Sequence, residues 1–154
     1  MTNIEVNRTF DIDGVLDAVR HCFNDVTEDD TDESAINSVS VDSECWLEFS
    51  IDDEILGYMQ FRPYNRTTLD IHPYIYKEHR LHSKECGKLS LNWFDQCAPQ
   101  MYRKLISQVP SCYRHIKRYT LGLGFELEGT HKKAFRKNGE LLDLWLFGRE
   151  RLQE

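Results

Sequence analysis

The feature that most constrains the fold is a helix-to-hairpin transition in the last third of the sequence. A helical pattern of apolar residues ends at Gly122 or Gly124, and glycine commonly terminates helices. A strand follows, then an Asn138-Gly139 pair, and then a second alternating run over residues 141–147. Because Asn-Gly between two alternating runs favours a two-residue turn, this region is predicted to be a helix followed by an antiparallel hairpin.

A second hairpin is predicted in the middle of the chain. Residues Cys45–Ile51 alternate between apolar and polar side chains, and the Asp52-Asp53 pair provides a turn into residues 55–61. Residues 67–75 follow as a third strand. Three consecutive strands joined by short connections indicate antiparallel pairing in this part of the sheet.

The helices are predicted from apolar residues at helical spacing. They occupy residues 15–23, with Asp11 or Asp13 as the cap, residues 83–98, and a stretch before Gly124 that Ser111 can cap. A short buried strand spans residues 104–109. The order of elements implies one α/β domain over residues 1–154, with a twisted, mixed, mostly antiparallel sheet flanked by helices.

Composition excludes several classes of protein. The chain of 154 residues is one domain in size, and no apolar run approaches the ~20 residues of a membrane span. The five cysteines are scattered and form no Cys-x-x-Cys pair, which favours free thiols in a reducing cytoplasm over disulfides or a metal site. A net charge of −7 and the lack of a known nucleic-acid module argue against a nucleic-acid partner.

Charge is distributed unevenly along the chain. Residues 1–60 hold two basic and sixteen acidic residues, whereas residues 61–154 hold seventeen basic and ten acidic ones. An acidic run over residues 28–33 lies in a stretch, residues 27–43, that is a candidate for flexibility. Two interpretations stay open: the halves face partners of opposite charge, or they attract each other within the fold.

The order of these motifs resembles the GCN5-related N-acetyltransferase (GNAT) superfamily over about residues 44–149. The matching segments are Ile55-Leu56-Gly57-Tyr58, the strand ending at Ile75, the approach Tyr76-Lys77-Glu78-His79-Arg80, the helix over residues 83–98, Gly124-Phe125 with Gly129, and Asp143 in the final strand. The sequence is most similar in character to small phage-encoded GNAT-like proteins, some of which are associated with head assembly.

The resemblance implies a site for acetyl-CoA. In the family, backbone N–H groups of a (Gln/Arg)-x-x-Gly-x-(Gly/Ala) loop hold the pyrophosphate at a helix N-terminus, where the helix dipole attracts anions. Here Arg80 begins the pattern, while Ser83 and Glu85 stand where glycine or another small residue is expected. The candidate cofactor-binding residues are Arg80, His82, Ser83, Lys84, Gly87 and Lys88, with Arg114, Lys117 and Arg118 as candidates for the 3′-phosphate. The alternative is a solvated basic helix face.

The resemblance also implies a catalytic base and a catalytic acid. His72 lies on the predicted central strand, on one face with Asp70 and Tyr74, and its pKa range suits a base. The acid is usually a tyrosine on the last helix, but Thr120 occupies that position here. Tyr119, one residue away and about 100° around the helix, is the candidate acid.

Two functions follow from the resemblance. The first is acetyl-CoA-dependent transfer to an amine, which can be a small molecule, a protein N-terminus or a lysine. The alternative is a catalytically silent GNAT fold that acts in assembly, with phage head proteins as partners, because the cofactor loop and the tyrosine depart from the family pattern. A sensor that binds acyl-CoA without turnover is a third interpretation. A homodimer also stays open, since family members often form dimers.

Overall fold

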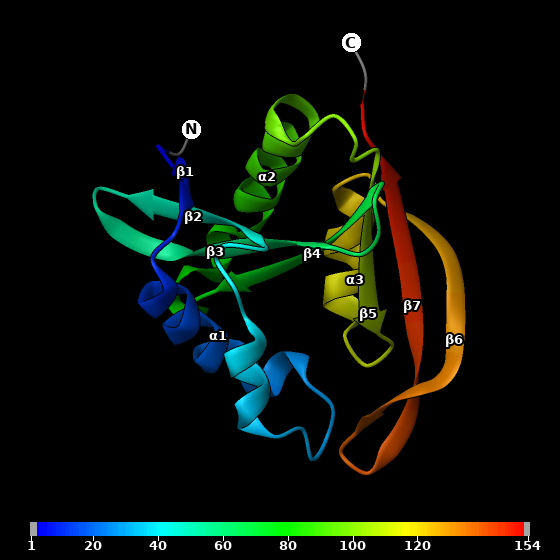
Figure 1. Cartoon of the computed structure of the whole chain (residues 1–154). Helices are drawn as coiled ribbons and strands as arrows, with labels where there is room; N and C mark the ends of the chain where they lie inside the picture. The colour runs from blue at the N-terminus through cyan, green and yellow to red at the C-terminus, as the bar shows by residue number, and fades with distance from the viewer. Residues whose placement is uncertain (1–2, 153–154) are drawn as a thin grey trace.

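Seven strands form one twisted sheet in the computed structural model, which describes residues 3–152 (Figure 1). The strands are β1 (Glu5–Thr9), β2 (Cys45–Ile51), β3 (Glu54–Pro63), β4 (Thr68–Ile75), β5 (Lys104–Pro110), β6 (Glu126–Lys137) and β7 (Glu140–Glu150). Their order in the sheet is β1-β2-β3-β4-β5-β7-β6. All neighbours are antiparallel except β4 and β5. This confirms the predicted mixed, mostly antiparallel α/β architecture.

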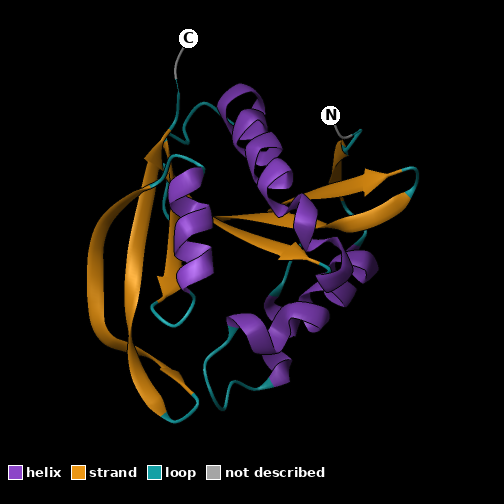
Figure 2. Cartoon of the chain, turned by 180° about the vertical axis from the view of Figure 1, so that it is seen from behind, coloured by secondary structure: helices purple, strands orange, loops and turns teal. Residues whose placement is uncertain are grey.

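The helices lie on both faces of the sheet. They are α1 (Ile12–Val26), α2 (Ser83–Cys97) and α3 (Arg114–Gly122), with two 3₁₀ helices, η1 (Glu33–Ser38) and η2 (Lys77–His82). Figure 2 shows α2 and α3 on one face, with α1 away from them. The described part of the chain contains no helix long and apolar enough to cross a membrane.

Two apolar cores correspond to the two faces. On the α2 face, Phe61, Phe94 and Leu105 are fully buried within one cluster. On the α1 face, Trp46 and Tyr58 pack with residues of α1 in a second cluster. Because side chains alternate along each strand, the central strands contribute to both clusters. The middle of the sheet is therefore covered on both sides.

Local sequence explains the start of α1 and the end of α3, but not the start of α3. Asp11 caps α1 by accepting a hydrogen bond from the Gly14 N–H at 3.3 Å, as predicted. The prediction that Ser111 caps α3 is wrong: its N–H donates to the Asp143 carbonyl at 2.9 Å, and α3 begins after Tyr113. Gly124 follows α3 with a φ of 94°, a left-handed conformation that favours glycine.

The sheet divides between β4 and β5. These strands pair over three residues, and the last pair is Asp70 with Ile106. Beyond that pair β4 continues along β3 to Ile75, while β5 continues along β7 to Pro110. The two strands diverge in Figure 1, so the edges that face each other leave the sheet open between them. We call this opening the β4–β5 split.

The acidic segment after α1 contacts the turn between β6 and β7. The Asp29 carboxylate accepts hydrogen bonds from the N–H groups of Asn138 at 3.0 Å and Gly139 at 2.8 Å, and these bonds lower the pKa of Asp29. The Glu28 carboxylate accepts from the Arg136 N–H at 2.9 Å. The acidic and basic parts of the chain therefore do meet within the fold, although these carboxylates bind backbone N–H groups rather than basic side chains.

Candidate functional site

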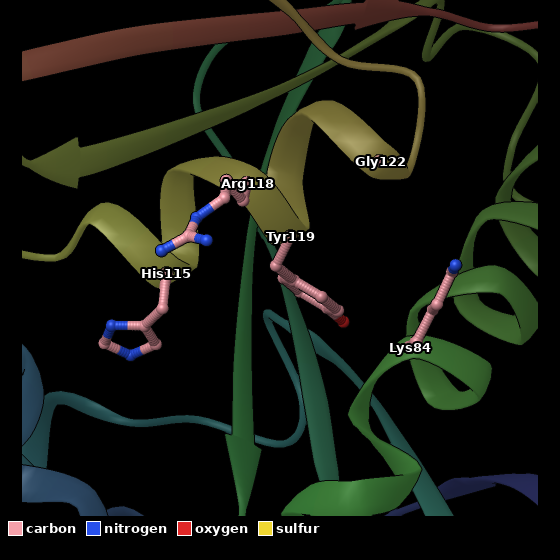
Figure 3. Close-up of a pocket in the computed structure, with 5 residues that line it drawn as sticks. All are labelled: Lys84, His115, Arg118, Tyr119 and Gly122. Carbon is pink, nitrogen blue, oxygen red and sulfur yellow. The ribbon is translucent and has the colours of Figure 1, made fainter.

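A surface cavity of about 430 Å³ lies between the start of α2 and one face of α3. It is lined by Lys84, His115, Arg118, Tyr119 and Gly122 (Figure 3). Four of these residues come from α3 at positions i, i+3, i+4 and i+7, the spacing that puts side chains on one helix face. Two cationic side chains and a histidine around one cavity make it suited to phosphate groups. We call it the outer cavity.

The sequence predicted part of this lining. Lys84 was a candidate for the pyrophosphate and Arg118 for the 3′-phosphate, and both line the outer cavity. The other two candidates from α3 lie elsewhere. The Nζ atom of Lys117 lies over the Trp145 ring, 4.5 Å from its centroid, in a cation–π contact. Arg114 is exposed and outside the cavity lining. His115 was missed, although its helical spacing from Arg118 would have identified it.

The segment before α2 differs from the glycine-containing loop of the family pattern. Residues up to His82 form η2, which runs directly into α2, and the Ser83 N–H donates to the Arg80 carbonyl. The Arg80 guanidinium is bound to the Asp25 carboxylate at 3.3 Å and to the Ile75 carbonyl at 3.4 Å. Arg80 is therefore directed to α1 and β4 rather than to the outer cavity. His82 and Lys88 also lie outside the cavity lining.

A second, smaller cavity lies at the β4–β5 split. Its volume is about 40 Å³, and we call it the inner cavity. The lining residues come from β3, β4, β5, α2, α3 and the segment after α3: Met59, Ile71, Pro73, Gly87, Ser107, Ile116, Tyr119, Thr120, Leu123 and Phe125. Gly87 leaves room for this arrangement, since a Cβ at this position would overlap the Tyr119 hydroxyl and lie 2.8 Å from Leu123 Cδ1. The lining is mainly apolar, which suits an uncharged ligand segment.

His72 lies on β4 at the same split, two residues beyond the last pair with β5. Its neighbours Ile71 and Pro73 line the inner cavity. The Nε2 atom of His72 is buried and has no hydrogen-bond partner among residues 3–152. Burial, with a smaller effect of Arg62, lowers the pKa of His72 to about 4, so the imidazole is neutral at pH 7. A neutral imidazole with an unbound nitrogen can accept a proton.

Tyr119 extends from α3 towards α2 between the two cavities (Figure 3). Its hydroxyl donates a hydrogen bond to the Ser83 carbonyl at 2.8 Å, and burial raises the pKa of Tyr119 well above its usual value. The neighbouring Thr120 is buried, and its hydroxyl donates to the Ile116 carbonyl at 2.8 Å. Tyr119 is therefore a protonated hydroxyl near the site, but it is engaged with α2 in this structure.

Protonation of His72 links stability to pH. The unfolded imidazole titrates near 6.5 and the folded one near 4, so protons bind the unfolded chain first as the pH falls. Well above pH 6.5 the imidazole is neutral in both states and adds no pH dependence to the free energy of unfolding, whereas that free energy falls as the pH drops through 6.5. Between about pH 7.5 and pH 5 we expect a loss of about 2 kcal/mol in the free energy of unfolding. Urea unfolding at both pH values tests this: His72→Gln should remove that loss, and an unchanged loss would contradict it.

Comparison with known proteins gives a fold but no sequence relative. No family model matches the chain, and no curated protein sequence matches it. Solved structures do match over nearly the whole length. The yncA protein of Salmonella typhimurium, solved with its cofactor acetyl-CoA, has a TM-score of 0.77 at 15% identity, covering 99% of this chain and 96% of that one.

Two further structures give the same result. The GNAT-family acetyltransferase of Streptococcus pneumoniae has a TM-score of 0.74 at 16% identity, covering 96% of this chain and 99% of that one. A spermidine N-acetyltransferase chimera of Vibrio cholerae SpeG and hSSAT has a TM-score of 0.72 at 13% identity, covering 97% of each chain. This chain has the GNAT fold. The fold agrees with the resemblance in motif order, and the chemistry has to be argued from the site itself.

The residues present fit one end of acetyl-CoA better than the other. The phosphate groups match the outer cavity in charge, because Lys84 and Arg118 line it. The uncharged part of acetyl-CoA that ends in the thioester, here called the thioester arm, would have to pass Tyr119 to reach the inner cavity. The inner cavity has a volume of about 40 Å³, which has room for about one water molecule. The arm therefore fits this GNAT fold only if Tyr119 moves.

Proposed function

We propose that this protein is an acetyl-CoA-dependent N-acetyltransferase that acts on an amine. The observation that carries the proposal is the arrangement of the site around the β4–β5 split. The basic outer cavity and the apolar inner cavity share Tyr119 in their linings, and His72 lies at the same split on the opposite face of the sheet, between Ile71 and Pro73 of the inner lining. This sequence of environments matches a ligand with a phosphorylated end, an uncharged arm and a reactive tip.

Lys84 and Arg118 hold the phosphates in this proposal, and His115 adds a hydrogen-bond donor at the same cavity. The free edge of β4 serves the arm. The Tyr76 N–H donates to the Leu56 carbonyl, so by alternation the backbone groups of Ile71 and Ile75 point away from β3. The Ile75 carbonyl is already bound to the Arg80 guanidinium at 3.4 Å, so it is the Ile71 carbonyl on this edge that can accept from an amide of an extended ligand. Pro73 lacks an N–H and offers only its carbonyl there.

His72 and Tyr119 supply the acid–base chemistry. When bound, acetyl-CoA supplies an acetyl group activated as a thioester. His72 accepts the proton that the acceptor nitrogen loses as the C–N bond forms, because its Nε2 is neutral and unpartnered. Tyr119 donates a proton to the sulfur as the C–S bond breaks, and its raised pKa keeps that proton on the hydroxyl until then. Tyr119 must first leave the Ser83 carbonyl.

The acceptor approaches His72 from the α1 face of the sheet. His72 belongs to the same face as Tyr58 and Tyr74, which pack against α1. Asp70 lies on this face too, bound to Arg62 at 2.9 Å, and α1 carries acidic residues in its exposed turns. The Arg62 guanidinium neutralises Asp70, so it is the exposed carboxylates of α1 that favour a cationic amine. The spermidine N-acetyltransferase among the structural matches is named for such a substrate.

The proposed compartment is a reducing cytoplasm, with which the five free cysteines are consistent.

Calorimetric titration with acetyl-CoA tests the proposal. We expect micromolar binding to the unmodified protein and a loss of affinity of about tenfold in each of Lys84→Ala and Arg118→Ala, since each removes one charged contact with a phosphate. The affinity is also expected to fall with added salt. Lys132→Ala is the matched control, because it removes an exposed positive charge on β6 outside the cavity lining.

The opposite outcome favours a second function. If acetyl-CoA does not bind at millimolar concentration, the fold is catalytically silent and acts through protein contacts, as in phage head assembly. Two observations favour this alternative: η2 occupies the place of the expected glycine-containing loop, and Tyr119 closes the way to the inner cavity. Affinity capture on phage structural proteins would then be the next measurement.

A further inference from the structure

Tyr119 is shared by the linings of the outer and inner cavities. In Figure 3 its ring extends from α3 across the space towards the helix that carries Lys84. The ring therefore stands between the basic cavity at the surface and the apolar cavity at the β4–β5 split. A ligand that enters from the outer cavity meets this side chain first.

Two residues of α2, Ser83 and Gly87, define the position of the Tyr119 hydroxyl. The hydroxyl donates to the Ser83 carbonyl in the first turn of α2 at 2.8 Å. Beneath the hydroxyl, the missing side chain of Gly87 provides the space, because a Cβ there would overlap the Tyr119 oxygen. The hydrogen bond joins neutral groups and can be exchanged for water when the side chain turns to the surface. The contact is thus specific and reversible.

We propose that Tyr119 is a gate that separates phosphate binding from entry of the thioester arm. While the hydroxyl is bound to Ser83, the outer cavity takes the phosphorylated nucleotide end of a ligand and the arm stays outside. When the ring rotates away, the two cavities join and the arm reaches the split beside His72. The same rotation frees the hydroxyl to act as a proton donor. This inference rests on the proposed function, because it concerns the same ligand.

Two probes separate the steps. Adenosine 3′,5′-bisphosphate carries the nucleotide and phosphates of coenzyme A without the arm, so it reports on the outer cavity. Coenzyme A carries the arm as well. While the gate is closed, coenzyme A binds through its nucleotide end alone, so the contribution of the arm to its affinity is reduced by the fraction of molecules that are open, and the affinity for the bisphosphate is unchanged.

Calorimetry with both probes on the unmodified protein, Tyr119→Ala and Tyr119→Phe tests the gate. In Tyr119→Ala we expect coenzyme A to bind at least about tenfold more tightly, while the bisphosphate affinity stays within about twofold. Tyr119→Phe keeps the ring and loses the hydrogen bond, so a gain of about fivefold is expected for coenzyme A. Tyr113→Phe, which removes a tyrosine hydroxyl just before α3, should change neither affinity.

The results that would contradict the gate differ from those that would contradict the proposed function. If both probes bind and the coenzyme A affinity is unchanged or lower in both Tyr119 variants, the gate is wrong and the proposed function stands. If neither probe binds to any variant, the gate and the proposed function both fail. Thermal unfolding of each variant shows whether the fold is intact, and Tyr119→Phe keeps the test decisive if the alanine variant does not fold.

Discussion

His72→Gln is expected to slow acetyl transfer by about 100- to 10,000-fold, the usual contribution of a positioned base. Glutamine is neutral and similar in size, so it preserves packing on the α1 face but cannot accept a proton. The effect should fall on kcat, since His72 lines neither the outer nor the inner cavity. The measurement is thiol release from acetyl-CoA with a panel of amines that includes spermidine and peptides with free N-termini.

The control for this substitution is His131→Gln. His131 is an exposed histidine on β6 outside both cavity linings, so its replacement should leave the rate within about twofold. A His72→Gln variant that retains more than about half of the rate would show that the base lies elsewhere or that the acceptor arrives already deprotonated. Binding of acetyl-CoA should be unaffected in either variant, which separates loss of chemistry from loss of the site.

The largest effect on stability is expected at Arg151. This arginine is 6% exposed, and its guanidinium donates five hydrogen bonds of 3.0–3.2 Å. The acceptors are the backbone carbonyls of Asp95, Ala98, Pro99 and Tyr102, at and beyond the end of α2. Carbonyls at the end of a helix have no partner within the helix, and a cation there also interacts favourably with the helix dipole.

Arg151→Ala is expected to lower the free energy of unfolding by about 3–5 kcal/mol, because several carbonyls lose their partner at about 1–3 kcal/mol each and water replaces only some of these bonds. Arg151→Lys keeps the charge but has fewer donors, so about half of that loss is expected. Arg114→Ala removes an exposed arginine and should change stability by less than about 0.5 kcal/mol. Urea unfolding measures all three, and an alanine variant within about 1 kcal/mol of Arg114→Ala would refute the role of Arg151.

The parts of the fold that were predicted from sequence depend on local signals. The Asn138-Gly139 turn is confirmed, with positive φ values at both residues, and Asp11 does cap α1. Period-two alternation also identified the strands of the first hairpin. Ser111 shows where such signals fail. A serine before a helical pattern favours a cap, but its backbone is held by β7, which lies more than thirty residues later in the sequence.

The site was less predictable because it depends on contacts between distant residues. Lys84 was proposed from a motif and lines the outer cavity, whereas the engagement of Arg80 with Asp25 depends on how α1 packs against β4. The contact of Tyr119 with Ser83 joins residues 36 positions apart, and no spacing rule places a side chain of one helix on the first turn of another. Arg151 gave no signal, because a charged residue after a final strand ordinarily lies in solvent.

The placement of β7 also determines the order in which a growing chain can fold during its synthesis. β5 is made long before β7, yet β7 is the strand that pairs with it on the side away from β4. β6, made between them, pairs with β7 in the described sheet and has no strand to join until β7 follows. The carbonyls at the end of α2 gain their hydrogen-bond donor still later, because Arg151 is synthesised after β7. The part of the molecule that carries α2 and β5 therefore leaves the ribosome with one edge of β5 unpaired. That edge is paired only after β7 has been synthesised.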